Sequence, residues 1–182
     1  YDSAGRVLAN IDALGNRTTS SYNSAGDLVA TINPLNKRVT TLYDAAGRSL
    51  ATIDPLSNRS TSIYDAAGQQ VAVTNPLAKR VTSVYDLAGR VVASIDPLGN
   101  RTTSIYNAAS QQVATVNPLG RRSTTLYDSA GRVASSIDPL GNRTTSIYNA
   151  ASQQIAVTNP LGRRSTIVFD AAGRAMARIN PL

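Results

Sequence analysis

One aromatic residue returns every 21 positions along the whole chain, and this spacing constrains the fold more than any other feature. Tyrosine takes the position eight times and the only phenylalanine takes it last: Tyr1, Tyr22, Tyr43, Tyr64, Tyr85, Tyr106, Tyr127, Tyr148 and Phe169. Eight full repeats and a 14-residue ninth account for all 182 residues. Because so short a repeat buries apolar side chains only against its neighbours, we expect one repeat array over residues 1–182. The sequence has no initiator Met and stops in mid-repeat, so we expect it to be a segment of a longer protein.

Each repeat carries two tight turns. In the fifth repeat they read Asp-Leu-Ala-Gly at 86–89 and Asp-Pro-Leu-Gly at 96–99. Asp in the first place and Gly in the fourth are typical of a type I turn, and the fixed φ of proline suits the second place. The predicted turn residues include Gly47, Gly89, Gly131, Asp54, Pro55, Asp96, Pro97, Asp138 and Pro139.

Two short segments rich in β-branched residues lie between the turns, at 90–95 and 101–106 in the fifth repeat. Their length and composition predict strands, not helices. Strands joined by tight turns at both ends make an antiparallel meander, because parallel neighbours need long crossovers. We therefore predict an all-β fold, a continuous antiparallel sheet of about 17 short strands. The alternative is a parallel β-solenoid with 42-residue turns.

Two invariant rows are predicted to form the structural core. The first is the aromatic row, represented by Tyr22, Tyr43, Tyr64, Tyr85, Tyr106, Tyr127 and Tyr148. The second is a leucine in the Pro-Leu turn of the repeats, namely Leu35, Leu56, Leu77, Leu98, Leu119, Leu140 and Leu161. A further apolar row includes Val92, Val113 and Ile155. A single repeat is too small to fold alone, so row-on-row packing must supply the stability.

The segment Tyr1-Asp-Ser-Ala-Gly-Arg6, followed by a β-rich stretch and a Thr-rich strand, resembles the YD repeat of Rhs, insecticidal-toxin-complex and teneurin proteins. Close counterparts start at Tyr43, Tyr85, Tyr127 and Phe169. The resemblance covers the whole chain. It implies a long β-sheet that spirals into a hollow shell, which in the toxins encloses a polypeptide cargo. The segments Tyr106–Gln111 and Tyr148–Gln153 depart from the pattern by losing Asp, Gly and Arg together.

Charge follows a second period of 42 residues. Odd repeats carry Asp-Pro and balanced charges, whereas even repeats carry Asn-Pro and a dibasic pair such as Lys37-Arg38, which accounts for most of the net charge of +7. One interpretation is duplication of a 42-residue unit. The other is that odd and even repeats occupy different structural environments.

Composition argues against catalysis and against bound cofactors. The chain has no histidine and no cysteine, so Ser-His-Asp, Cys-His and His/Cys metal sites are excluded. Aspartates such as Asp54 could bind calcium, but Asn33 and Asn75 fill the same slot, which favours turn formation. We expect no catalytic residues, no metal and no cofactor.

The basic pI of 10.1 raises the question of nucleic acid, since an arginine row from Arg17 to Arg164 could follow phosphates and the tyrosines could stack bases. Only 16% of residues are charged, however, and aromatic rows at repeat spacing are typical of cores. We therefore expect no nucleic-acid partner. No apolar run approaches the roughly 18 residues of a membrane span.

These observations predict a non-enzymatic structural array of a large secreted or cell-surface protein, forming an extracellular fibre, filament or stalk. The alternative is the wall of a toxin-enclosing shell, and a basic nucleic-acid- or glycan-binding surface is a weaker one. The expected partners are further copies of the chain joined end to end or flanking repeats, with an enclosed polypeptide or surface glycans as alternatives.

Overall fold

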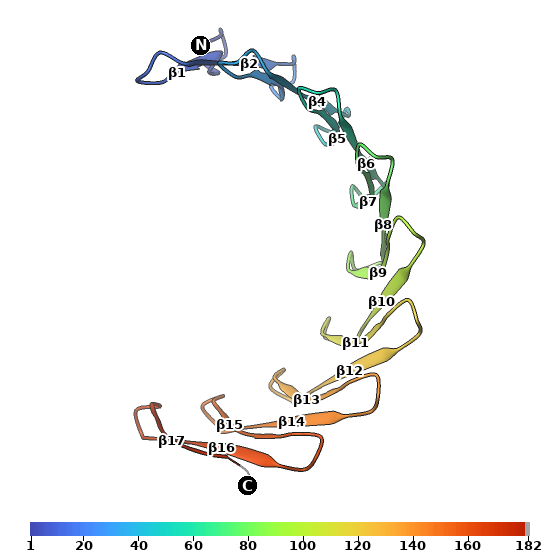
Figure 1. Cartoon of the computed structure of the whole chain (residues 1–182), viewed down its shortest axis with the longest axis vertical. Helices are drawn as coiled ribbons and strands as arrows, with labels where there is room; N and C mark the ends of the chain where they lie inside the picture. Colours follow the sequence, from blue (N-terminus) through green and yellow to red (C-terminus); the bar gives the residue numbers. More distant parts are fainter. Residues whose placement is uncertain (181–182) are drawn as a thin grey trace. The chain divides into compact units, whose positions relative to one another are not determined.

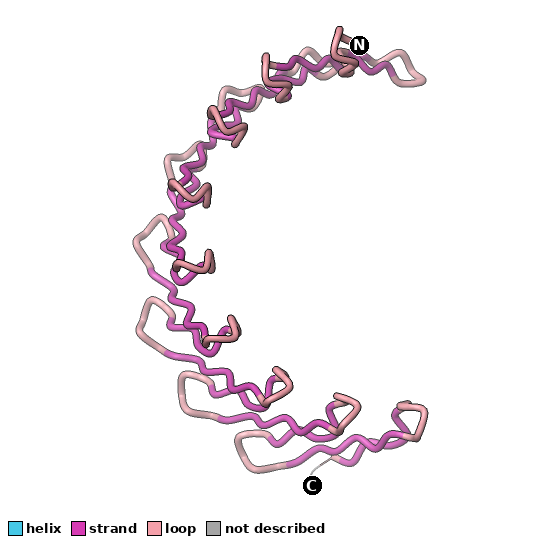
Figure 2. The backbone as a smooth tube through the Cα atoms, turned by 180° about the vertical axis from the view of Figure 1, so that it is seen from behind, coloured by secondary structure: helices cyan, strands magenta, loops and turns pink. Residues whose placement is uncertain are grey.

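The computed structural model describes residues 1–180 and contains strands and turns only (Figure 2). Two positions of the sequence, Pro181 and the last leucine of the repeat row, lie outside the described residues. The chain divides into two compact units, Tyr1–Gly89 with Ile95–Gly99, and Arg90–Ser94 with the residues from Asn100 onward. No helix in residues 1–180 is long and apolar enough to cross a membrane.

The strands have the same place in every repeat, two per 21 residues. They are β1 (Ala9–Ile11), β2 (Arg17–Tyr22), β3 (Leu28–Ile32), β4 (Arg38–Tyr43), β5 (Ser49–Ile53), β6 (Arg59–Tyr64), β7 (Gln70–Thr74), β8 (Arg80–Tyr85), β9 (Val91–Ile95), β10 (Arg101–Tyr106), β11 (Gln112–Val116), β12 (Arg122–Tyr127), β13 (Val133–Ile137), β14 (Arg143–Tyr148), β15 (Gln154–Thr158), β16 (Arg164–Phe169) and β17 (Ala175–Ile179).

Pairing follows chain order and is antiparallel throughout. In the first unit the pairs run from β1–β2 to β7–β8, and in the second unit they run from β9–β10 to β16–β17 (Figure 1). A β-bulge lies before Tyr22, Tyr43, Tyr64, Tyr106, Tyr127, Tyr148 and Phe169, as between Leu42 and Tyr43, where the register shifts. The predicted all-β fold with antiparallel strands is confirmed. The solenoid alternative is wrong, because parallel pairing is absent from the pairs described between residues 1 and 180.

The buried core is a row of small residues. Ala51 pairs with Leu42 on one side and with Thr61 on the other, and its exposed fraction is 2%. The buried row comprises Ala30, Ala51, Ala72, Ala93, Ala114, Ser135 and Ala156. Larger neighbours on the same side of the sheet cover each small side chain, so the smallest residue becomes the most buried. We call this side the alanine face.

The seven tyrosines from Tyr22 to Tyr148 lie half-buried and contribute a hydrogen bond as well as a ring, whereas Tyr1 is exposed. The Tyr64 hydroxyl donates to the backbone oxygen of Ser49 at 3.0 Å, fifteen residues earlier in the chain. The same i−15 bond is made by Tyr22, Tyr43, Tyr85, Tyr106, Tyr127 and Tyr148, at 3.0–3.1 Å. Each tyrosine therefore fixes the start of its own repeat to the preceding one.

The leucine row does not belong to the core of this structure, and the expectation that it is buried is wrong for these residues. The exposed fractions run from 77% to 83% for Leu35, Leu56, Leu77, Leu98, Leu119, Leu140 and Leu161. Each leucine occupies the third place of its turn, beyond the ends of the paired strands, where no second layer of the described chain covers it. Invariance within the array reflects a common turn template and not burial.

Candidate functional site

The turns form two rows, one at each end of the strands, and these rows are the candidate functional surfaces. The tyrosine rim consists of the turns that follow the aromatic residue, at 2–5, 23–26, 44–47, 65–68, 86–89, 107–110, 128–131, 149–152 and 170–173. The proline rim consists of the turns at 12–15, 33–36, 54–57, 75–78, 96–99, 117–120, 138–141 and 159–162.

Both rims use one turn geometry. In the turn at 44–47 the Gly47 N–H donates to the Asp44 oxygen and the Asp44 N–H donates to the Arg48 oxygen, both at 3.0 Å. The fourth turn residue has a positive φ, which is 75° at Gly47 and reaches similar values at Gly89 and Gly131 (both 78°). Glycine adopts this conformation without the steric cost that a side chain brings.

Five turns place another residue in this left-handed region. They end in Asn36, Ser57, Ala78, Ser110 and Ser152, with φ between 56° and 66°. The last two belong to the repeats that depart from the Asp-x-Ala-Gly pattern. The fold therefore retains the turn even where the sequence supplies a less suitable residue.

The turn aspartates are used as caps of their own turns. Oδ1 of Asp54 accepts the N–H groups of Leu56 and Asn58 at 2.8 and 2.9 Å, and Oδ2 accepts the Asn58 amide at 2.9 Å. The Asn58 side-chain bond is the main cause that holds the pKa of Asp54 below its usual value. Asn75 accepts the corresponding two backbone bonds at 3.0 Å, so either residue forms the turn. Asp138 is bonded as Asp54 is, and Asp96 accepts the Leu98 N–H.

No group of three or more potential metal-ligating side chains occurs among the described residues.

The predicted turn prolines Pro55, Pro97 and Pro139 lie in the second place of their turns, as do their counterparts along the proline rim. The arrangement at this rim is thus one of self-contained turns.

At the tyrosine rim, an arginine of the odd repeats reaches into the following even repeat. Arg48 Nε donates to Oδ2 of Asp44 at 2.7 Å within its own turn, and Nη1 contacts the Asp65 backbone oxygen at 3.4 Å. Its guanidinium carbon lies 4.8 Å from the centre of the Tyr64 ring, a cation–π arrangement. The same contact to the next ring, at 4.7–4.9 Å, is made by Arg6, Arg90 and Arg132.

The junction from an even repeat to the next odd repeat is built differently. There Gln111 donates through Nε2 to the Gly131 oxygen at 3.3 Å, and Gln153 does the same to Gly173 at 2.9 Å. No guanidinium is placed over Tyr43, Tyr85 or Tyr127 in residues 1–180. The 42-residue alternation therefore has a structural counterpart: odd and even repeats occupy different environments at this rim.

Sequence reasoning missed both the alanine row and the arginine contacts. A signal for the arginines was present, because Asp and Arg four residues apart occur together at Asp44/Arg48 and are replaced together at Asn107/Gln111. Such paired replacement indicates a mutual contact. The alanine row could have been found from a position that stays small in every repeat.

Charge is distributed unequally between the rims. At the tyrosine rim each of Arg6, Arg48, Arg132 and Arg174 is ion-paired to the aspartate four residues before it. At the proline rim every repeat presents an exposed arginine at the start of its second strand; we call Arg17, Arg38, Arg59, Arg80, Arg101, Arg122, Arg143 and Arg164 the arginine row. Within the described residues these eight arginines form no ion pair. Positive charge therefore outweighs the four turn aspartates of the proline rim, Asp12, Asp54, Asp96 and Asp138.

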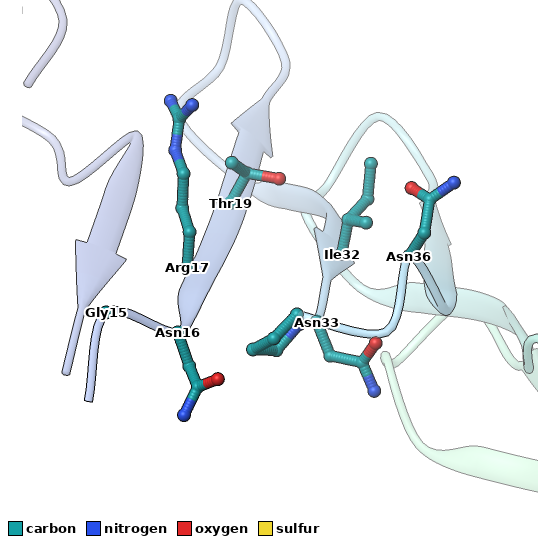
Figure 3. A pocket seen from close by; sticks show the side chains of 8 residues that line it. Gly15, Asn16, Arg17, Thr19, Ile32, Asn33 and Asn36 are labelled. Carbon is teal, nitrogen blue, oxygen red and sulfur yellow. The ribbon is translucent and has the colours of Figure 1, made fainter.

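Shallow recesses separate consecutive turns of the proline rim. One is lined by Arg17, Thr19, Ile32 and Asn36, among others, and Figure 3 shows Arg17, Thr19 and Ile32 extending to the same side of the sheet. An equivalent recess, one repeat further on, contains Arg38, Thr40 and Ile53. These two recesses are one repeat apart and lie on the alanine face.

The sequence profile of the family described as RHS Repeat matches four stretches, residues 1–38, 43–80, 85–122 and 127–164. Each match begins at the tyrosine of an odd repeat and spans most of a 42-residue pair. No curated protein matches the sequence.

Several solved structures share the fold. The crystal structure of TcdB2-TccC3-TEV aligns with 100% of this chain at a TM-score of 0.74 and 19% identity, and that of TcdB2-TccC3 without its hypervariable C-terminal region aligns with 98% at 0.71 and 18% identity. The Photorhabdus luminescens Tc holotoxin pore aligns with 99% at 0.60 and 15% identity. The chain spans only 11–13% of the length of these chains.

Proposed function

Because the chain belongs to the RHS repeat family, we propose that it forms part of the wall of a hollow shell that encloses a toxin polypeptide. The observation that carries the proposal is that each unit is a single layer of strands. In residues 1–180, the strands of each unit contact only their neighbours along the chain. A wall needs one continuous layer with two accessible faces, whereas a filled fibre needs a second layer against one of them.

Exposure on the two faces agrees with a wall. Leu42 and Ile63 on the alanine face are 41% and 43% exposed, and Val73 and Val81 on the opposite face are 39% and 42% exposed. Both faces thus keep apolar side chains partly open, which suits a layer with a polypeptide on one side. The similarity to Tc toxin structures over the whole chain supports the same interpretation.

In this role the repeats act mechanically and perform no chemistry. Hydrogen-bonded ladders continue from repeat to repeat, and the arginine and tyrosine contacts fix their order. We propose that flanking repeats continue the sheet at both ends, that the enclosed polypeptide is the partner, and that the assembled protein is secreted or displayed at the cell surface.

Electron microscopy of the longest natural chain that contains this sequence tests the proposal. We expect hollow particles with a thin wall, and an enclosed polypeptide that resists added protease until the shell is opened at low pH or in denaturant. Filaments or solid rods would instead support the fibre hypothesis. Digestion of the second polypeptide at the same rate in the assembly as in isolation would contradict enclosure.

A further inference from the structure

The arginine row has a regular spacing that follows from the fold. Each arginine begins the second strand of its repeat, so neighbouring arginines are two strands apart. Strands lie about 4.7–4.9 Å from one another, which places successive arginine backbones roughly 9.4–9.8 Å apart. Each unit presents four of them: Arg17, Arg38, Arg59 and Arg80 in the first, and Arg101, Arg122, Arg143 and Arg164 in the second.

Local hydrogen bonds through Nε aim four of these side chains, Arg38, Arg101, Arg122 and Arg143, along the alanine face. Nε of Arg38 donates to Oγ1 of Thr40 at 3.1 Å, and Nε of Arg122 donates to Thr124 at 3.3 Å. Arg143 Nε instead donates to Oγ of the buried Ser135 at 2.8 Å. With Nε engaged, the two terminal nitrogens of the guanidinium remain for a carboxylate, which they bind in a two-pronged geometry.

The spacing selects among anionic partners. A polyproline II helix rises 3.1 Å per residue with three residues per turn, so every third side chain lies on one side at intervals of about 9.3 Å. A β-strand places every third side chain on the opposite face, and therefore does not present such a series to one row. Single-stranded nucleic acid is bound with stacking aromatics, and here every tyrosine lies at the opposite ends of the strands.

We propose that within each unit the four arginines of the row form a docking surface for an acidic polypeptide segment in the polyproline II conformation, with a carboxylate at every third residue. The segment runs across the strands along the proline rim, and each carboxylate meets one guanidinium. The threonine hydroxyls and the recesses between turns accommodate its backbone. The site is a property of the open sheet and stands independently of the proposed shell.

Binding of a fluorescein-labelled peptide made of four consecutive Pro-Pro-Glu triplets, one for each row arginine of a unit, tests the inference; we call it the triplet peptide. Fluorescence anisotropy at 0.15 M salt measures its affinity for the 182-residue chain. The block peptide has the same composition, but its four glutamates are adjacent and lie between two runs of four prolines. We expect the block peptide to bind at least fivefold more weakly. Equal affinity for the two peptides, or equally tight competition by a DNA duplex of matched charge, would overturn the inference, because charge alone would then suffice.

Two matched double variants test the row itself. Arg38→Gln with Arg80→Gln removes two members of the row, whereas Lys37→Gln with Lys79→Gln removes the same charge from the residues just before them. At about 0.2–1 kcal/mol for each exposed ion pair, the arginine double should weaken binding of the triplet peptide by about 2- to 30-fold. The lysine double should change it by less than about 1.5-fold. An equal loss in the two doubles would contradict docking at the row.

Discussion

The tyrosine rim and the proline rim share a turn geometry but differ in what their side chains do. At the tyrosine rim, Arg48 connects Asp44 of its own turn to the ring and backbone of the following repeat, and Tyr64 reaches back to Ser49. At the proline rim, Asp54 satisfies only its own turn and Leu56 extends outward with 77% of its surface exposed. One rim joins repeats, and the other leaves charged and apolar groups open to partners.

The largest expected effect breaks a junction at the tyrosine rim. Tyr64→Ala removes a half-buried ring, its hydroxyl bond to Ser49 and the stacking of Arg48, so we expect a loss of about 2–3 kcal/mol in unfolding free energy. Tyr43→Ala is the matched control because Tyr43 makes the hydroxyl bond without a stacked arginine. The unfolding free energies of the two variants, measured by urea titration, should differ by the cation–π contribution. A smaller loss for Tyr64→Ala than for Tyr43→Ala would show that the stacking adds nothing.

The arginine contact should be measurable by itself. Arg48→Gln removes an ion pair and a cation–π contact, together about 1–2 kcal/mol. Arg59→Gln, in the arginine row, should cost less than about 0.5 kcal/mol because it loses no ion pair. Chemical denaturation of both variants provides the comparison. Similar losses would mean that the rims do not differ in the way that their contacts indicate.

A turn of the proline rim should be improved by glycine. Ala78 has a φ of 59°, so Ala78→Gly relieves a steric cost and should stabilise the chain by about 0.5–1 kcal/mol, after the entropy of the unfolded glycine is subtracted. Ala46→Gly is the control, since Ala46 is not among the residues with positive φ. Thermal unfolding should show opposite signs for the two substitutions. Destabilisation by Ala78→Gly would contradict strain at this turn.

Acid should weaken the turns that contain aspartate. Hydrogen bonds from Asn16, Asn58 and Asn142 lower the pKa values of Asp12, Asp54 and Asp138 in the folded chain. A carboxyl group whose pKa is lower in the folded chain stabilises the fold at pH values above its pKa in the unfolded chain, about 3.9. This contribution is lost as the pH falls through the folded pKa.

Replacing Asp12, Asp54 and Asp138 together by asparagine, the residue at this slot in even repeats, should therefore reduce the loss of stability between pH 6 and pH 2.5. Urea midpoints at the two pH values measure it. The aspartates of the tyrosine rim stay in place in this variant and leave a remaining acid dependence. An unchanged loss would assign the acid sensitivity to that rim alone.

The smallest expected effect concerns the leucines. Leu56→Ala removes an exposed side chain, so the free energy of unfolding should change by less than about 0.5 kcal/mol in the isolated chain. Denaturant titration of Leu56→Ala and of Tyr64→Ala compares the unfolding free energy that each of the two invariant rows contributes. A loss above about 2 kcal/mol would show that the leucines are buried in the core.

Sequence patterns alone predicted the repeat length and the two strands and two turns of each repeat, and they favoured the antiparallel meander over a parallel solenoid. These features follow from residues that act on their own backbone: the turn residues Asp54 and Gly47, the proline that fixes φ, and short β-branched segments with no room for a crossover. The tyrosine row was also visible, because an aromatic residue at constant spacing must find the same environment each time.

Which rows are buried and which are exposed follows from the folded sheet and could not be predicted from the repeat pattern. Ala51 is buried because Leu42 and Thr61 flank it across the ladder, and Leu56 is exposed because a turn carries it past the strand ends. A repeat pattern shows that positions are equivalent, but burial depends on which neighbours the register places beside them. The same register pairs Arg48 with Tyr64, sixteen residues apart, and so turns a charge alternation into two kinds of junction.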